Sequence, residues 1–138
     1  MQTILIIIGS LVVGFLLLNV YARYAMKKVP KVADHANILT LTDKNFDQQL
    51  KNKVMLVDFF ADWCAPCKMM IPILNEVAED LTGNTRVGKV DTGQFQSIAV
   101  RYNVRSIPTM VLFKNGKEVK RFVGIKQKDF LLKELKSV

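Results

Sequence analysis

The chain has 138 residues, half of them hydrophobic, and its mean hydropathy is +0.18. That length suits one domain. The formal net charge is +8, but four of the twenty basic residues directly follow an N-terminal apolar run, and the other sixteen exceed the twelve acidic residues by only four. These basic residues are scattered, whereas nucleic-acid binding requires a clustered basic face, so no nucleic-acid partner is expected.

The N-terminal apolar run contains no charged residue from position 4 to position 22. As a helix it would rise roughly 28 Å, close to the hydrocarbon thickness of a bilayer. We therefore predict a single-pass transmembrane anchor over residues 1–24, with residues 4–22 in the membrane, and a linker over residues 25–37. A cleaved signal peptide is the main alternative, although the run is too long and no basic residue precedes it. A buried helix of a soluble protein is the other.

Basic residues at positions 23, 27, 28 and 31 follow the predicted anchor, and none precedes it. The positive-inside rule therefore predicts that the C-terminal domain lies in the cytoplasm. An extracytoplasmic domain is the alternative, because outward-facing domains of this anchored type are also known.

Short helical and strand patterns alternate after the linker and end in a hairpin signal at Asn115-Gly116. They predict helices over residues 43–50, 65–81, 95–102 and 126–136, and strands over residues 54–60, 86–91, 109–114 and 118–123. Interleaved helices and strands with one hairpin indicate an α/β domain over residues 38–138, with a mixed central sheet and helices on both faces.

The only cysteines, Cys64 and Cys67, lie where a predicted buried strand ends and a helix begins. The first turn of a helix presents free N–H groups and the positive end of the helix dipole, both of which stabilise a thiolate. Pro66 suits that turn because its missing N–H costs no helical bond. The Cys-x-x-Cys spacing therefore predicts a pair that alternates between dithiol and disulfide.

Two other interpretations of the cysteine pair fit less well. A zinc site needs four ligands, and His35 is the only histidine, so no metal is expected. A purely structural disulfide over so short a loop would restrict the unfolded chain little.

Residues 57–68 (VDFFADWCAPCK) resemble the active-site segment of the thioredoxin family. Residues 105–116 (RSIPTMVLFKNG), followed by Gly124 at the family's spacing, resemble its second motif. The similarity covers roughly residues 38–137 and implies the thioredoxin fold.

The resemblance implies roles for four residues in catalysis. Cys64 is expected to be the exposed attacking cysteine and Cys67 the resolving one. Asp58 is expected to take and return a proton, which agrees with the cost of several kcal/mol for an unpaired carboxylate in an apolar strand. Lys89 matches the family's lysine near that acid, and a structural Asp58–Lys89 ion pair is the alternative interpretation.

The resemblance also implies a substrate-binding surface around the cysteines, with Pro108 in the cis form beside them. Ala65 stands where the family usually has glycine, which leaves the redox potential open on the order of tens of millivolts. The residues expected at this surface are Trp63, Ala65, Pro66, Ile107, Pro108 and Gly124.

The predicted activity is protein-disulfide reduction for redox homeostasis, without a bound cofactor. The expected partners are protein disulfide substrates, the membrane, and a thioredoxin reductase or a transmembrane electron donor. One alternative is an extracytoplasmic oxidoreductase, isomerase or maturation factor. Another is a non-catalytic binding module tethered to a membrane.

Overall fold

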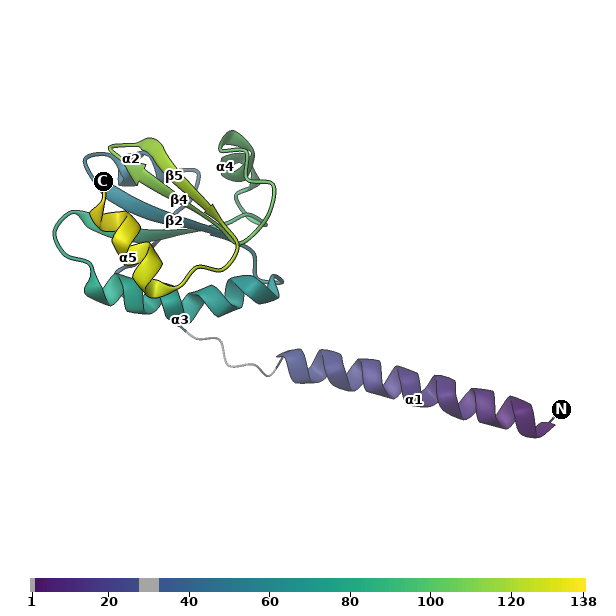
Figure 1. Cartoon of the computed structure of the whole chain (residues 1–138). Coiled ribbons are helices and arrows are strands. Elements are labelled where there is room, and N and C mark those ends of the chain that lie inside the picture. Colours follow the sequence, from purple (N-terminus) through teal and green to yellow (C-terminus); the bar gives the residue numbers. More distant parts are fainter. Residues whose placement is uncertain (1, 28–32) are drawn as a thin grey trace. The chain divides into compact units, whose positions relative to one another are not determined.

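A computed structural model of the chain describes residues 2–27 and 33–138. The chain divides into two compact units, Met1–Lys31 and Val32–Val138. The first unit holds the helix α1 (Gln2–Lys27), and the second holds the remaining elements (Figure 1). In chain order these are β1 (Ile38–Thr40), α2 (Phe46–Leu50), β2 (Val54–Phe60), α3 (Ala65–Asp80), β3 (Thr85–Asp91), α4 (Gln96–Arg101), β4 (Thr109–Lys114), β5 (Lys117–Val123) and α5 (Lys128–Lys136).

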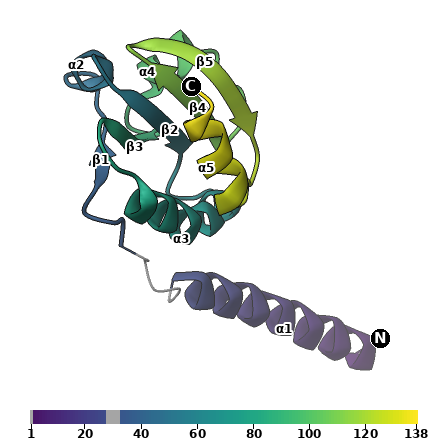
Figure 2. The ribbon, with the colours of Figure 1, turned by 60° about the vertical axis from the view of Figure 1, so that its left-hand side comes forward.

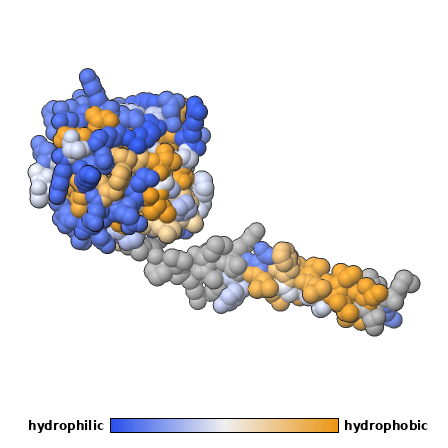
Figure 3. Space-filling model, viewed as in Figure 1, coloured by the Kyte–Doolittle hydropathy of each residue, from blue (hydrophilic) through white to orange (hydrophobic). Residues whose placement is uncertain are grey.

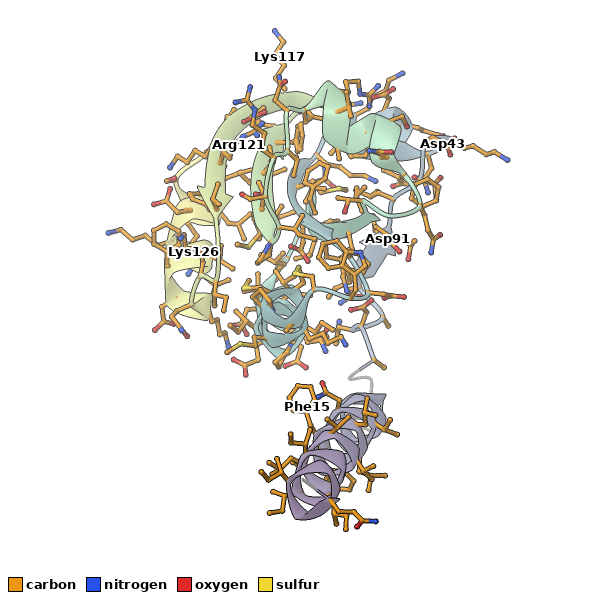
Figure 4. All side chains as sticks on the ribbon, turned by 90° about the vertical axis from the view of Figure 1, so that its right-hand side faces the viewer. Phe15, Asp43, Asp91, Lys117, Arg121 and Lys126 are labelled. Carbon is orange, nitrogen blue, oxygen red and sulfur yellow. A yellow bond between two sulfur atoms is a disulfide. The ribbon has the colours of Figure 1, made fainter. Side chains whose placement is uncertain are left out.

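The N-terminal unit is a single helix of 26 residues, formed where the apolar run predicts one. Its described isoleucine, leucine, valine and phenylalanine side chains are largely exposed, and the helix is mostly hydrophobic in Figure 3. Those side chains, Phe15 among them, point outward around the helix (Figure 4). Within the part of the chain that the structure describes, no helix is long and apolar enough to cross a membrane, so the predicted transmembrane helix is not supported. Residues 28–32 of the predicted linker lie outside the described residues.

The second unit is built on a five-stranded mixed sheet with strand order β1-β3-β2-β4-β5. The strands β1, β3 and β2 are parallel, whereas β4 and β5 continue the sheet in antiparallel pairing. The central strand β2 is buried along five of its seven positions. This burial explains its continuous apolar sequence, which is typical of a strand covered on both faces.

Helices cover both faces of this sheet (Figures 1 and 2). On one face α2 and α4 bury an apolar cluster that includes Phe46, Phe59 and Phe113. On the other face α3 and α5 bury a second cluster that includes Leu56, Leu74 and Leu131. Each such side chain contributes about 1.5–3 kcal/mol on full burial. The predicted fold, a mixed sheet with helices on both faces, is confirmed.

The largest differences from the predicted elements of the second unit are at β1 and at the start of α2, while the other predicted bounds are within two residues of the observed ones. The strand β1 was not predicted, because its three residues are too few to show a pattern and it forms only by pairing with β3. The helix α2 begins at Phe46 rather than at residue 43. The side chain of Asn45 accepts a hydrogen bond from the Thr42 N–H and donates one to the Thr40 carbonyl, which holds residues 42–45 in a turn.

Candidate active site

The two cysteines lie at the junction that leads from β2 into α3. Cys64 is the N-cap residue of α3 and has an extended backbone, while Pro66 lies in the first helical turn. The Cys64 sulfur accepts a hydrogen bond from the N–H of Cys67 at 3.3 Å. The two residues form a disulfide, with their Cα atoms 5.3 Å apart. The predicted position of the pair at a helix N-terminus, where a thiolate is stabilised, is therefore confirmed.

The disulfide is nearly buried on both sides, with 4% of Cys64 and 3% of Cys67 exposed. The expected exposure of Cys64 is therefore wrong for the oxidised protein. Ala61 belongs to the same small apolar cluster, and Phe60 and Ile107 pack against it. In contrast, Trp63 is 78% exposed, and Ala65 and Pro66 are exposed as well. Solvent therefore reaches these three side chains much more readily than the two sulfur atoms.

A second segment reaches the disulfide from the start of β4. The Ile107–Pro108 peptide bond is cis, as the resemblance implies. The Pro108 carbonyl accepts a hydrogen bond from the N–H of Gly124 at 2.9 Å, which ties this loop to the end of β5. Gly124 has a φ of +80°, a conformation that glycine adopts without the steric cost of a Cβ atom. Three predicted substrate-binding residues, Ile107, Pro108 and Gly124, are thus brought together.

A surface hollow of about 310 Å³ opens beside Trp63 and Ile107. Its far wall consists of residues that sequence reasoning missed: Thr92, Gly93, Gln96, Ala99, Val100, Val104, Arg105 and Ser106. Val100 of α4 is 67% exposed in the structure. An apolar residue on the outer face of a short helix is the one feature of the sequence that could have indicated this surface. The hollow extends the predicted surface from the disulfide toward α4.

Asp58 is the one charged residue within β2, and only 1% of it is exposed. Among the described residues, its Oδ1 is the only buried side-chain oxygen or nitrogen without a hydrogen-bond partner. Burial raises the pKa of this carboxyl group from 3.8 to about 7; the charge of Lys89 opposes this effect and that of Asp34 adds to it. Asp58 can therefore gain and lose a proton near neutral pH.

Lys89 pairs in register with Asp58 across β2 and β3, and only 6% of it is exposed. Its ammonium group binds the carboxylate of Asp34 at 2.7 Å and lies 4.3 Å from the centre of the Phe60 ring. Within the described part of the chain no ion pair joins Lys89 to Asp58. The alternative interpretation of Asp58 as half of a structural ion pair is therefore not supported. Asp34 was missed because it lies 55 residues from Lys89 in the sequence.

Comparison with known proteins identifies this arrangement. A sequence model of the family described as Thioredoxin matches residues 37–137. The chain belongs to the thioredoxin family. It is 43% identical to a thioredoxin of Staphylococcus haemolyticus over 98 residues, which make up 71% of this chain and 94% of that protein. The same figures hold for a thioredoxin of Staphylococcus aureus strain Mu50. The solved structure of a mutant thioredoxin from Halobacterium salinarum is similar at 35% identity, with a TM-score of 0.69, over 77% of this chain and 94% of that one.

As a thioredoxin with its Cys64–Cys67 pair in place, the chain is a thiol-disulfide oxidoreductase with reductase activity on disulfides. The family match begins at residue 37, after α1. Among the described residues, no group of three or more His, Cys, Asp or Glu side chains is placed to hold a metal ion.

Proposed function

We propose that this thioredoxin reduces disulfides of partner proteins by a two-step exchange, in which Cys64 attacks and Cys67 resolves. The observation that carries the proposal is the disulfide at the N-terminus of α3, with the unpaired carboxyl group of Asp58 buried in the neighbouring strand. Trp63, Ala65 and Pro66 border the pair on one side, and Ile107, Pro108 and Gly124 would bind an extended segment of the substrate on the other.

In the first step the Cys64 thiolate attacks one sulfur of the substrate disulfide. A mixed disulfide forms, and the other substrate sulfur leaves as a thiolate that takes up a proton. The capping position of Cys64 favours this role, because the free N–H of Cys67 points at its sulfur and stabilises negative charge there.

In the second step the Cys67 thiol gives its proton to the Asp58 carboxylate and attacks the Cys64 sulfur. The mixed disulfide breaks, the second substrate sulfur leaves as a thiolate that takes up the proton held by Asp58, and the Cys64–Cys67 disulfide remains. Both electrons come from the dithiol. A carboxyl group with a pKa of about 7 suits the transfer, because it accepts a proton and returns it at similar cost. Lys89 acts on this acid through its charge rather than through a direct bond.

The Cys67→Ser and Cys64→Ser variants of the full chain test this assignment, with insulin as the disulfide substrate. Cys67→Ser should accumulate a covalent adduct with the substrate, seen on non-reducing gels, because its mixed disulfide is not resolved. Cys64→Ser should form much less adduct. Equal amounts of adduct in the two variants, or adduct in Cys64→Ser alone, would reject the assignment of attacking and resolving cysteines.

We also propose that α1 brings the domain to a membrane. Support comes from its length of 26 residues and from the exposed apolar side chains of residues such as Ile6, Leu11 and Leu18. A surface of this kind is covered by lipid or by protein in the cell. The full chain should sediment with membranes and resist carbonate extraction, while replacement of Ile6, Leu11 and Leu18 by Ser should release it. Full extraction of the unchanged chain by carbonate would contradict the proposal.

The basic residues that follow the apolar run in the sequence favour a cytoplasmic domain, which a thioredoxin reductase would supply with electrons. The alternative is an extracytoplasmic domain that is supplied by a transmembrane donor. Lys117 is a suitable reporter, because it is exposed at the tip of the β4–β5 hairpin (Figure 4). In a chain with Cys64→Ser and Cys67→Ser, a Lys117→Cys thiol on the cytoplasmic side would resist a membrane-impermeant maleimide until lysis. Labelling of intact cells would favour the alternative.

A further inference from the structure

The segment 33–37, here called the strap, precedes β1 and is fixed to the domain by one side chain of α3. The amide nitrogen of Asn75 donates to the Ala33 carbonyl at 2.9 Å, and its amide oxygen accepts from the His35 N–H at 2.8 Å. The His35 carbonyl accepts a hydrogen bond from the Ile38 N–H at 2.8 Å, and the Nδ1 atom of the His35 ring accepts one from the Asn37 N–H at 3.2 Å. Asn75 therefore holds the backbone on both sides of Asp34.

The position of Asp34 determines which carboxylate the buried lysine binds. Lys89 lies in register with Asp58, yet its ammonium group is bonded to Asp34 at 2.7 Å. Asp34 is 44% exposed, whereas Asp58 is 1% exposed and has an oxygen without a hydrogen-bond partner. A buried lysine next to an unpaired buried carboxyl group would ordinarily bind it, because each removes the desolvation cost of the other. Asp34 offers that ammonium group a different partner.

The charged groups of the described residues that act on Asp58 are Lys89 from β3 and Asp34 from the strap. The register neighbour on β4 is Met110, which carries no charge, and the cysteines at the start of α3 are joined in a neutral disulfide. Lys89 lowers the pKa of Asp58 and Asp34 raises it, while burial has the largest effect. Loss of the Asp34 charge would therefore lower the pKa of Asp58 in two ways, because the negative charge is removed and Lys89 is released.

We propose that Asp34 is a positioning residue for the resolving step: by binding Lys89 it keeps the ammonium group from pairing with Asp58 and leaves that carboxyl group free to exchange the proton of Cys67. The inference rests on the proton-transfer role proposed above for Asp58. Asp34 lies just before residue 37, where the match to the thioredoxin family model begins. The strap thus controls which charge lies next to the buried acid.

The test compares the full chain with its Asp34→Asn variant in two measurements. The first is the carboxyl ¹³C NMR titration of Asp58, which reports its protonation without any activity. The second is the pH dependence of the rate at which the mixed disulfide is resolved. In Asp34→Asn both midpoints should move to lower pH by about one unit, the lower end of the effect of an opposite charge on a carboxyl group. Asp34→Glu, which retains the charge, should restore most of the original profile.

Three further variants separate this role from a merely structural one. Asp47→Asn is the matched control, because it makes the same substitution and removes an ion pair to Arg101 between α2 and α4; both midpoints should stay in place. Asn75→Ala removes no charge but frees the strap, and should shift the midpoints in the same direction as Asp34→Asn. Lys89→Gln should shift them to higher pH.

The outcomes distinguish the inference from the proposal on which it depends. If Asp58→Asn abolishes the pH dependence of resolution while Asp34→Asn lowers stability without moving either midpoint, the strap is only a structural attachment and the inference is wrong. If Asp58→Asn leaves the pH dependence unchanged, the proposed role of Asp58 fails. In that case an NMR midpoint that still moves in Asp34→Asn would show that Asp34 controls Lys89 without acting on catalysis.

Discussion

The buried carboxyl group of Asp58 should make the free energy of unfolding depend measurably on pH. Burial raises its pKa from 3.8 to about 7. Between about pH 4 and pH 7 the unfolded chain has released this proton while the folded chain still holds it, so a rise in pH favours the unfolded state. A shift of this size, at about 1.4 kcal/mol per unit, corresponds to roughly 4 kcal/mol. The stability contributed by the protonated carboxyl group is therefore greatest below about pH 4 and is lost by about pH 7.

The Asp58→Asn variant isolates this contribution, because its amide has nearly the same shape and does not titrate in this range. Urea unfolding of the oxidised full chain, followed by circular dichroism from about pH 4 to pH 8.5, gives the free energy of unfolding of both proteins. The difference, wild type minus variant, should fall by roughly 4 kcal/mol between about pH 4 and pH 7 and then level off. Titration of the other groups cancels in this difference.

The Asn side chain has a fixed cost of its own, because its buried N–H donors need partners; this cost moves the whole curve without changing its slope. Asp47→Asn serves as the control, since it replaces an exposed carboxylate in a surface ion pair that contributes about 0–1 kcal/mol. A difference between wild type and Asp58→Asn that stays constant with pH would refute the reasoning. It would mean that the folded protein ionises Asp58 as easily as the unfolded chain does.

Three further predictions concern packing and the substrate surface. Gly88→Ala should lower the free energy of unfolding by about 1–3 kcal/mol in urea titrations. The reason is that the new Cβ would lie 2.6 Å from a methyl carbon of Leu41 and 3.0 Å from the Met55 sulfur. An unchanged urea midpoint would show that these two side chains move aside without a cost in stability. Trp63→Ala should change stability by less than about 0.5 kcal/mol, because the side chain is 78% exposed, yet raise the KM for protein disulfides in steady-state assays. Val100→Asp should also raise that KM without unfolding the protein, and an unchanged KM would place the hollow beside α4 outside the substrate surface.

Local pattern in the sequence was sufficient for most of the fold. The strands β2 and β4 have the predicted bounds, and the helix α3 begins at the predicted residue, because continuous apolar runs and a 3.6-residue period are properties of each segment alone. The strand β1 could not be predicted in this way, since it exists only through its pairing with β3. The start of α2 was misplaced because the side chain of Asn45 stabilises a turn in front of the helix.

The chemistry at the cysteines was likewise determined by the sequence. The spacing of Cys64 and Cys67, the following proline and the strand before them specify a redox pair at a helix N-terminus, because all of these features lie within a few residues of one another. What the sequence did not determine is the surroundings of the pair. The burial of Cys64 in the oxidised state depends on Phe60 and Ile107, and the hollow beside Trp63 depends on α4.

The tertiary structure alone decided how the buried charges are paired. Asp58 can be recognised in the sequence as the one charged residue of an apolar strand. Lys89 on the neighbouring strand is the partner that the sequence suggests for it. Which carboxylate that lysine binds depends on where the strap lies, and the strap is held by Asn75, about forty residues away along the chain. A contact between segments so distant in sequence leaves no local pattern. The sequence alone therefore specified the reaction centre, whereas packing determined the charge that surrounds its buried acid.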